Sequence, residues 1–248
     1  MTTNAWAIPQ WDGRRFAAAL FDLDGVLTPT AEVHMKAWHR MFTDYFTKHD
    51  ITPPYTDADY FTYVDGKPRY DGVRACLASR GVQLPEGSPD DAAGTETICG
   101  VGNIKNDAFE RILHEEGVEA YPGSVQLMDH LEPLGVAMAV VSSSRNAPAV
   151  LEAAGLAHRF EVVVDGNVGA QEGIAGKPAP DMFSLAATRL GVADSDSVVV
   201  EDALSGVQAG AAGAFGLVVG VDRGAGVNAL MDNGAQVVVE DLKELIVQ

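Results

Sequence analysis

The sequence has 248 residues, enough for one large domain or for a core domain that carries an insertion. Its 35 acidic residues outnumber 17 basic ones, and the net charge of −18 argues against a surface that binds nucleic acid or an anionic membrane. If the protein binds an anionic substrate, its scarce lysines and arginines must therefore be concentrated at the site.

The two cysteines and the hydropathy pattern indicate the compartment. Cys76 and Cys99 form neither a disulfide framework nor a zinc-binding spacing, so we expect reduced thiols. No stretch approaches the roughly 20 apolar residues of a membrane span. Residues 1–15 contain no apolar segment of signal-peptide length. We expect a soluble, cytoplasmic protein that is a monomer.

The first predicted element is a buried strand over the apolar run 16–20. Asp22 and Asp24 follow it on one face, and Gly25 allows the chain to turn sharply at once. Two carboxylates on one face repel each other, so the pair needs a cation or a shared proton. An Asp-x-Asp pattern alone is more often an ordinary acidic turn.

A helix is predicted over 31–48, where apolar residues recur at helical spacing. His34 and Trp38 are four residues apart and therefore share one face of this helix, which a packed aromatic stripe would also explain.

Residues 50–117 lack valine-rich strands, and we interpret them as a small, mostly helical insertion. Within it we predict helices over 70–79 and 107–116. A polar segment with glycine and proline, 85–97, predicts a surface loop.

From residue 121 onward, strands and helices alternate, which predicts a parallel sheet built from right-handed crossovers. The predicted helices cover 124–134, 180–190 and 206–212, with another beginning near 147. The predicted strands cover 136–141, 160–164, 197–200, 215–221 and 236–239. Because the carboxyl ends of parallel strands share one edge of the sheet, the polar residues there should be neighbours.

Polar residues follow these strands at three further places. Ser142 and Ser143 follow a strand at a helix start, which is a ready anion site. Lys177 precedes a helix and is flanked by prolines, and Glu201 with Asp202 follows a buried strand. Taken singly, these are more often an N-cap, a surface lysine and a solvated turn.

Together, these residues fit one chemistry. Three carboxylates supply the hard oxygen ligands that Mg²⁺ prefers; they are Asp22, Glu201 and Asp202. Lys177 and Ser142 can neutralise a phosphoryl group beside the metal. A carboxylate next to a cation and a phosphate site suits an aspartyl-phosphate intermediate. Asp24 can give and take the proton of the leaving and attacking oxygens.

These segments resemble the four motifs of the haloacid dehalogenase superfamily of phosphotransferases, in the same order. The resemblance is nearest to its β-phosphoglucomutase branch and covers nearly the whole chain except the N-terminal tail. The similar segments are 22–34, 121–123, 142–146 and 177–181. It implies an α/β fold: a Rossmann-like parallel-sheet core over 1–30 and 118–248 with an inserted, mostly helical cap domain over 31–117.

The resemblance also implies roles for the motif residues. Asp22 is the nucleophile that is phosphorylated, and Asp24 is the general acid/base whose backbone carbonyl also binds Mg²⁺. Asp202 completes the metal site with Glu201, directly or through water. The phosphoryl group is held by Ser142, Ser143 and Lys177.

The remaining implied roles concern the substrate. Thr30 and His34 lie at the hinge into the cap, with Trp38 one turn further along the helix. Arg69 and Lys105 match cap residues that bind the distal, non-reacting phosphate. The core contributes contacts to the sugar phosphate from Ser144, Arg145 and Asn146.

The activity implied is a Mg²⁺-dependent mutase that interconverts β-D-glucose 1-phosphate and D-glucose 6-phosphate, with glucose 1,6-bisphosphate as intermediate and activator. Its partner is thus a small phosphorylated sugar. A sugar-phosphate phosphatase with the same aspartyl phosphate is the alternative. A sugar-phosphate-binding or partner-interaction module that has lost turnover is the third.

The sequence departs from the family pattern at a few positions. Pro29 replaces a frequent acid, and Arg145 stands where lysine is common. An insertion over roughly 85–102 is absent from the small bacterial mutases. Lys67 competes with Arg69 for the distal-phosphate role.

Overall fold

The computed structural model of the protein describes residues 6–8, 11 and 13–246 and divides into two compact units. One unit comprises Met1–Pro29 with Val118–Gln248, and the other comprises Thr30–Gly117. Part of the N-terminal segment for which we expect no signal peptide (1–5, 9–10 and 12) lies outside the described residues. Among the described residues, no helix combines the length and apolarity needed to cross a bilayer.

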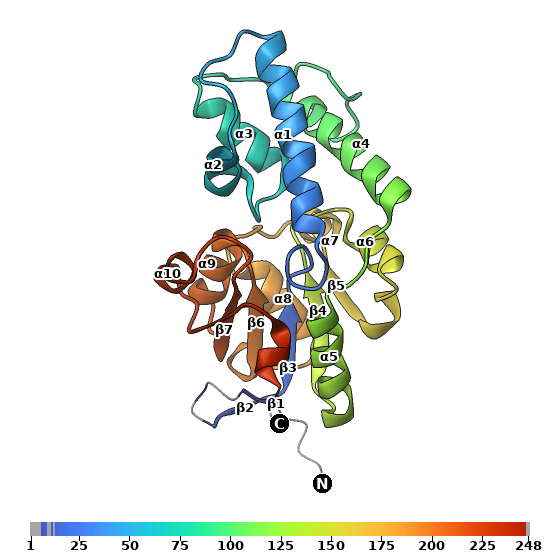
Figure 1. The fold of residues 1–248 in the computed structure, drawn as a ribbon, viewed down its shortest axis with the longest axis vertical. Coiled ribbons are helices and arrows are strands. Elements are labelled where there is room, and N and C mark those ends of the chain that lie inside the picture. The colour runs from blue at the N-terminus through green and yellow to red at the C-terminus, as the bar shows by residue number, and fades with distance from the viewer. Residues whose placement is uncertain (1–5, 9–10, 12, 247–248) are drawn as a thin grey trace. The chain divides into compact units, whose positions relative to one another are not determined.

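The larger unit contains a six-stranded sheet in the order β5-β4-β3-β6-β7-β8 (Figure 1). The strands are β3 (Ala18–Phe21), β4 (Ala137–Val141), β5 (Val162–Val164), β6 (Ser197–Glu201), β7 (Leu217–Val221) and β8 (Val237–Val239). Every neighbouring pair is parallel, which confirms the predicted α/β fold. Strands β4 and β6 contain runs of valine and are almost wholly buried, and β3 between them is buried throughout, as expected for strands covered on both faces.

Helices cover both faces of this sheet. Apolar residues of α8 (Asp181–Leu190), α9 (Leu204–Ala212) and α10 (Val227–Asp232) join the core on one face. The connections from β3 to β4 and from β4 to β5 run in the opposite direction across the sheet. Right-handed crossovers therefore place α5 (Pro122–Leu131) and α6 (Ala147–Ala153) on the other face.

The register of the central strands fixes where the functional edge lies. Phe21 of β3 pairs with Val140 of β4 and with Val200 of β6. The residues that follow these three positions therefore leave the sheet at the same level, and they include the predicted motif residues.

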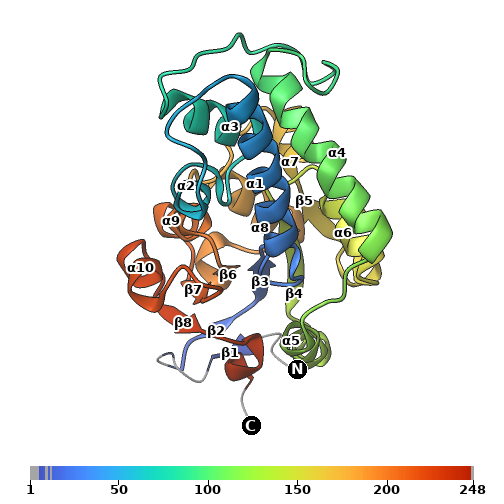
Figure 2. The same ribbon diagram turned by 45° about the horizontal axis from the view of Figure 1, so that its top comes forward.

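The smaller unit is helical. It contains α1 (Thr30–Lys48), α2 (Asp57–Asp59), a π-helical turn η1 (Tyr60–Val64), α3 (Arg69–Ala78) and α4 (Ile98–Glu116). Helices α1 and α4 run side by side (Figure 2). The buried residues of α1 recur at helical spacing and form an aromatic-rich core with α3 and α4.

Helix α4 corrects one prediction. We expected a helix over 107–116 with a loop before it, but the helix begins at Ile98. Gly100 and Gly102 suggested a loop, yet they serve close packing: a Cβ would lie 2.4 Å from the Thr95 carbonyl oxygen at Gly100 and 2.9 Å from the Tyr70 ring at Gly102. The surface loop predicted over 85–97 is therefore confirmed, and residues 98–102 of the predicted insertion belong to α4.

Other differences lie at short elements. Phe16 belongs to a two-stranded hairpin, β1 (Trp6–Ala7) with β2 (Arg15–Phe16), rather than to the central strand. Helices α7 (Gly166–Glu172) and α10 have seven and six residues, too few to show a clear period in the sequence. Asp165 caps α7 by accepting hydrogen bonds from two backbone N–H groups. This N-cap aspartate was a local sequence signal for the start of the helix.

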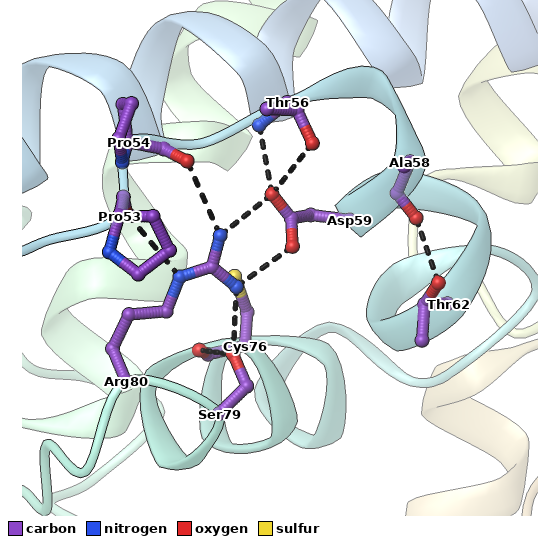
Figure 3. Close-up of polar contacts among 9 residues, drawn as sticks. All are labelled: Pro53, Pro54, Thr56, Ala58, Asp59, Thr62, Cys76, Ser79 and Arg80. Atoms are coloured by element: carbon purple, nitrogen blue, oxygen red, sulfur yellow. Dashed lines mark hydrogen bonds and ion pairs between the residues drawn. The ribbon is translucent and has the colours of Figure 1, made fainter.

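A buried ion pair connects two segments of the smaller unit (Figure 3). The Arg80 guanidinium donates to both carboxylate oxygens of Asp59, at 2.7 and 2.6 Å. Asp59 also accepts from the Thr56 backbone N–H and hydroxyl, which begins the helix that follows. Arg80 donates further to the carbonyls of Pro53 and Pro54, so one arginine fixes the whole 53–59 turn.

Candidate active site

The ends of β3, β4 and β6 bring together the first predicted motif residues. Asp22 follows β3, and its backbone N–H donates to the Val200 carbonyl at 2.9 Å. Ser142 follows β4, and its backbone N–H donates to the Val164 carbonyl at 3.0 Å. Glu201 ends β6 and is fully buried. The sheet thus continues to hold these residues at its carboxyl edge, as the sequence predicted.

Lys177 reaches this edge from the loop before α8. Its Nζ lies 2.5 Å from Asp22 Oδ1 and 2.5 Å from Glu201 Oε1, and it donates to the Val141 carbonyl at 2.9 Å. The lysine side chain is 1% exposed. One buried ammonium therefore joins the ends of all three strands.

Burial and neighbouring charges shift the pKa values of Asp22 and Lys177. Burial raises the pKa of Asp22 well above its usual range; Lys177 opposes the shift, while Glu201 and Asp24 add to it. Burial alone would lower the pKa of Lys177, but attraction to Asp22 and Glu201 outweighs it and raises the pKa. Lys177 therefore stays charged, and the acidic groups around Asp22 favour the arrival of another cation.

The donor set fits a magnesium ion. Oxygen atoms of Asp22, Glu201 and Asp202 all lie within 4.8 Å of one another. Such hard carboxylate oxygens suit Mg²⁺, which retains water in its remaining positions. The Glu201 carboxylate is oriented because its Oε2 accepts from the backbone N–H groups of Asp202 and Ala203. The predicted contribution of the Asp24 backbone carbonyl stays a prediction.

Two glycines allow the carboxylates to approach the backbone. Gly25 has φ of 88°, and a Cβ there would lie 1.9 Å from Asp202 Oδ2. At Gly206, in α9, a Cβ would lie 1.8 Å from Glu201 Oε1. A side chain at either position would displace an acidic group of the cluster.

Asp24 contacts the serine-rich loop that follows β4. The Ser142 hydroxyl donates to Asp24 Oδ2 at 3.4 Å and accepts from the Ser144 backbone N–H at 3.1 Å. The Ser144 hydroxyl in turn accepts from the Asn146 N–H at 3.1 Å. Ser143 and Arg145 belong to the same loop, and the Arg145 carbonyl accepts from the Asn167 side chain at 3.0 Å.

In the smaller unit, two predicted substrate residues, His34 and Trp38, lie beside Lys105. The lysine is 3% exposed, and its Nζ contacts His34 Nδ1. Nζ also lies 5.4 Å from the centroid of the Trp38 ring and 4.8 Å from that of Phe109. The His34 ring stacks on Phe109 at 4.0 Å. Thr30, the first residue of α1, begins the helix that carries His34 and Trp38.

Arg69 is held by two asparagines that the sequence analysis missed. Its Nη1 donates to Asn103 Oδ1 at 3.3 Å, and its Nη2 donates to Asn106 Oδ1 at 2.6 Å. The competing residue, Lys67, donates to the Thr62 carbonyl at 3.3 Å. The spacing of the two asparagines on one helix was not recognised, because the prediction placed both of them in a loop.

Arg223 is a further residue that no motif indicated. Its Nε donates to the Gly25 carbonyl at 2.8 Å, and its guanidinium lies 4.0 Å from the centroid of the Tyr121 ring. It thus holds the backbone directly after Asp24. Because Arg223 follows the strand ending at Val221, attention to that strand end as well would have found it.

Comparison with known proteins agrees with this geometry. The family model of haloacid dehalogenase-like hydrolases matches residues 16–213, which include every motif residue described above. The chain belongs to this family. The predicted family resemblance is therefore confirmed.

Relatives within the family carry different activities. The chain is 48% identical to a β-phosphoglucomutase of Mycobacterium tuberculosis over 92% of its length and 91% of that protein. It is 30% identical to a fructose-1-phosphate phosphatase of Escherichia coli, over 79% of this chain and 91% of that one. The crystal structure of a β-phosphoglucomutase from Clostridium difficile matches the fold with a TM-score of 0.73 at 23% identity, covering 93% of each chain.

Proposed function

We propose that the protein is a phosphomutase that interconverts β-D-glucose 1-phosphate and D-glucose 6-phosphate through an aspartyl phosphate and glucose 1,6-bisphosphate. The observation that carries this proposal is the contact of Lys177 with both Asp22 and Glu201 at the end of β3. The 48% identity to a β-phosphoglucomutase favours this reaction among those of the family.

The chemistry begins at Asp22. Its carboxylate attacks the phosphorus atom of the bound phosphate, and the bond from phosphorus to the leaving oxygen breaks. Asp24 protonates that leaving oxygen and later removes the proton from the sugar hydroxyl that accepts the phosphoryl group. Lys177 and the Ser142 hydroxyl stabilise the charge on the transferring oxygens.

The metal belongs to the same step. Asp22, Glu201 and Asp202 would hold Mg²⁺, which supplies positive charge beside the phosphoryl oxygens. The buried Glu201 orients this arrangement, because its second oxygen is fixed by two backbone N–H groups.

Arg69 is the residue we assign to the distal phosphate. The two asparagine oxygens orient its guanidinium without contributing charge, which suits recognition of a phosphate. The family resemblance implies the same role for Lys105. Its buried contact with His34 favours a different one, in which Lys105 positions His34.

A phosphatase is the second candidate. It would use the same aspartyl phosphate but pass the phosphoryl group to water, and the 30% identity to a fructose-1-phosphate phosphatase favours it. The two reactions differ in whether a second phosphate must be bound, so Arg69 is the residue that distinguishes them.

The test is a single incubation with two readouts. The protein is mixed with Mg²⁺, β-glucose 1-phosphate and a trace of glucose 1,6-bisphosphate, and glucose 6-phosphate and free phosphate are measured in parallel. We expect glucose 6-phosphate without matching phosphate release. Free phosphate with no glucose 6-phosphate would identify a phosphatase. If neither product forms, both proposals are contradicted.

A further inference from the structure

The insertion loop 85–97 folds back onto the start of α4. The backbone N–H groups of Ile98 and Cys99 donate to the carbonyls of Pro85 and Glu86, at 3.0 and 3.1 Å. The two ends of the loop are therefore hydrogen-bonded to each other at the start of α4. Such closure gives an irregular segment a fixed path, because its backbone polar groups have partners.

Asp91 organises the interior of this loop. Its Oδ2 accepts from the Ser88 backbone N–H at 3.1 Å and from the Thr97 hydroxyl at 2.6 Å. Gly87 has φ of 75°, and a Cβ there would lie 2.2 Å from the same carboxylate oxygen. The chain thus approaches Asp91 too closely for a larger residue.

Asn103 connects the loop to Arg69. Its Nδ2 donates to the carbonyls of Pro89 and Asp91, at 3.1 and 2.8 Å. Its Oδ1 accepts from Arg69 Nη1 at 3.3 Å and from the Tyr70 hydroxyl at 3.1 Å. With carbonyls on one side and donors on the other, the amide has one orientation that satisfies all four contacts.

We propose that the loop 85–97 acts through Asn103 as a positioning device for the Arg69 guanidinium. This inference rests on the proposed function, because Arg69 is assigned there to the second phosphate of a sugar bisphosphate. A guanidinium fixed before the ligand arrives loses less rotational freedom on binding, so the loop raises the affinity for that phosphate. Asn103 is thus a positioning residue and Asp91 its support.

Two variants test this with a matched control. Asn103→Ala removes the link itself. Asp91→Ala removes the carboxylate that holds Ser88 and Thr97 but keeps the backbone carbonyl that accepts from Asn103. Asp90→Ala removes the neighbouring exposed carboxylate and serves as the control. We expect each of the first two variants to raise KM for the sugar phosphate about 10-fold, the cost of one hydrogen bond to a charged group, with a smaller change in kcat. The control should stay within twofold.

A second readout is independent of the substrate. In ¹⁵N NMR spectra, the Nη groups of Arg69, assigned with the help of Arg69→Lys, should rotate slowly in the unaltered protein and in Asp90→Ala. Rotation should be faster in Asn103→Ala and Asp91→Ala, while the melting temperature shows that both variants remain folded.

The two readouts separate the possible failures. If the unaltered protein converts no sugar phosphate but Arg69 rotation still responds to Asp91→Ala, the proposed function is wrong and the positioning stands. Unchanged Arg69 rotation in both variants overturns the positioning, whatever the enzyme does. An equal rise in KM for Asp90→Ala would also overturn it, since the effect would then be one of charge.

Discussion

Each unit holds a buried aspartate–cation pair among its described residues, and the pKa values of the two aspartates are shifted in opposite directions. Asp22 with Lys177 and Asp59 with Arg80 have contact distances of 2.5 and 2.6 Å, and the aspartate side chains are 10% and 12% exposed. Burial raises the pKa of Asp22, whereas hydrogen bonds from Arg80 lower the pKa of Asp59.

The difference lies in how many carboxylates share each cation. Arg80 gives two hydrogen bonds to the Asp59 carboxylate, its other hydrogen bonds go to neutral oxygen atoms, and Thr56 gives Asp59 two more. Lys177 divides its contacts among Asp22, Glu201 and a backbone carbonyl. Asp59 is therefore satisfied by the folded chain. The raised pKa of Asp22 shows that its negative charge is not fully compensated, which is what we expect of the nucleophile we propose.

The largest expected effect is that of Asp22→Asn on turnover. We expect a loss of at least about 10⁴-fold, because an amide cannot form the phosphorylated intermediate. Lys177 keeps Glu201 as a partner, so the protein should remain folded. Steady-state kinetics and a thermal melt check both points. Retained activity would remove the assignment of the nucleophile.

Asp59→Asn should lower the stability of the protein rather than its turnover. The change leaves the guanidinium of Arg80, whose side chain is 4% exposed, without its carboxylate, and we expect a loss of about 3–5 kcal/mol in the free energy of unfolding. Urea titration measures it, with the exposed Asp57→Asn as control. A loss equal to that of the control would show that this pair does not stabilise the smaller unit.

Arg69 differs from both of these cations, because side-chain amides of two asparagines accept its hydrogen bonds. Arg69→Ala should reduce mutase kcat/KM by about 100-fold while lowering hydrolysis of a generic phosphate ester less, since only the bisphosphate reaction uses a distal phosphate. Parallel assays on both substrates make the comparison. Equal losses would argue that Arg69 does not recognise a second phosphate.

The smallest effect concerns acid stability. Because the pKa of Asp59 is lowered from its ordinary value of 3.8, the unfolded state binds the proton first as the pH falls. The stabilisation is thus complete above about pH 4 and is lost as the pH falls below 3.8 through the folded-state pKa. The difference in unfolding free energy between the unaltered protein and Asp59→Asn should shrink over this window. A constant difference would mean that Asp59 titrates alike in both states.

Much of the fold and of the core site was predictable because it depends on local patterns. Alternating apolar runs indicated the parallel sheet, and the rule that such strands end at one edge brought Asp22, Ser142 and Glu201 together. Prediction failed where tertiary packing overrode local propensity. Helix α4 begins at Ile98 despite two early glycines, since these glycines lie against Thr95 and Tyr70.

The sequence by itself determined the alternation of strands and helices and the chemical character of each strand end, because these follow from the spacing and type of neighbouring residues. Only the tertiary structure decided which distant groups meet. Lys177 contacts Asp22 across 155 positions, and Arg223 holds Gly25 across 198. It also decided that Asn103 links the insertion loop to Arg69. Such contacts depend on the direction of side chains in space, which no local pattern specifies.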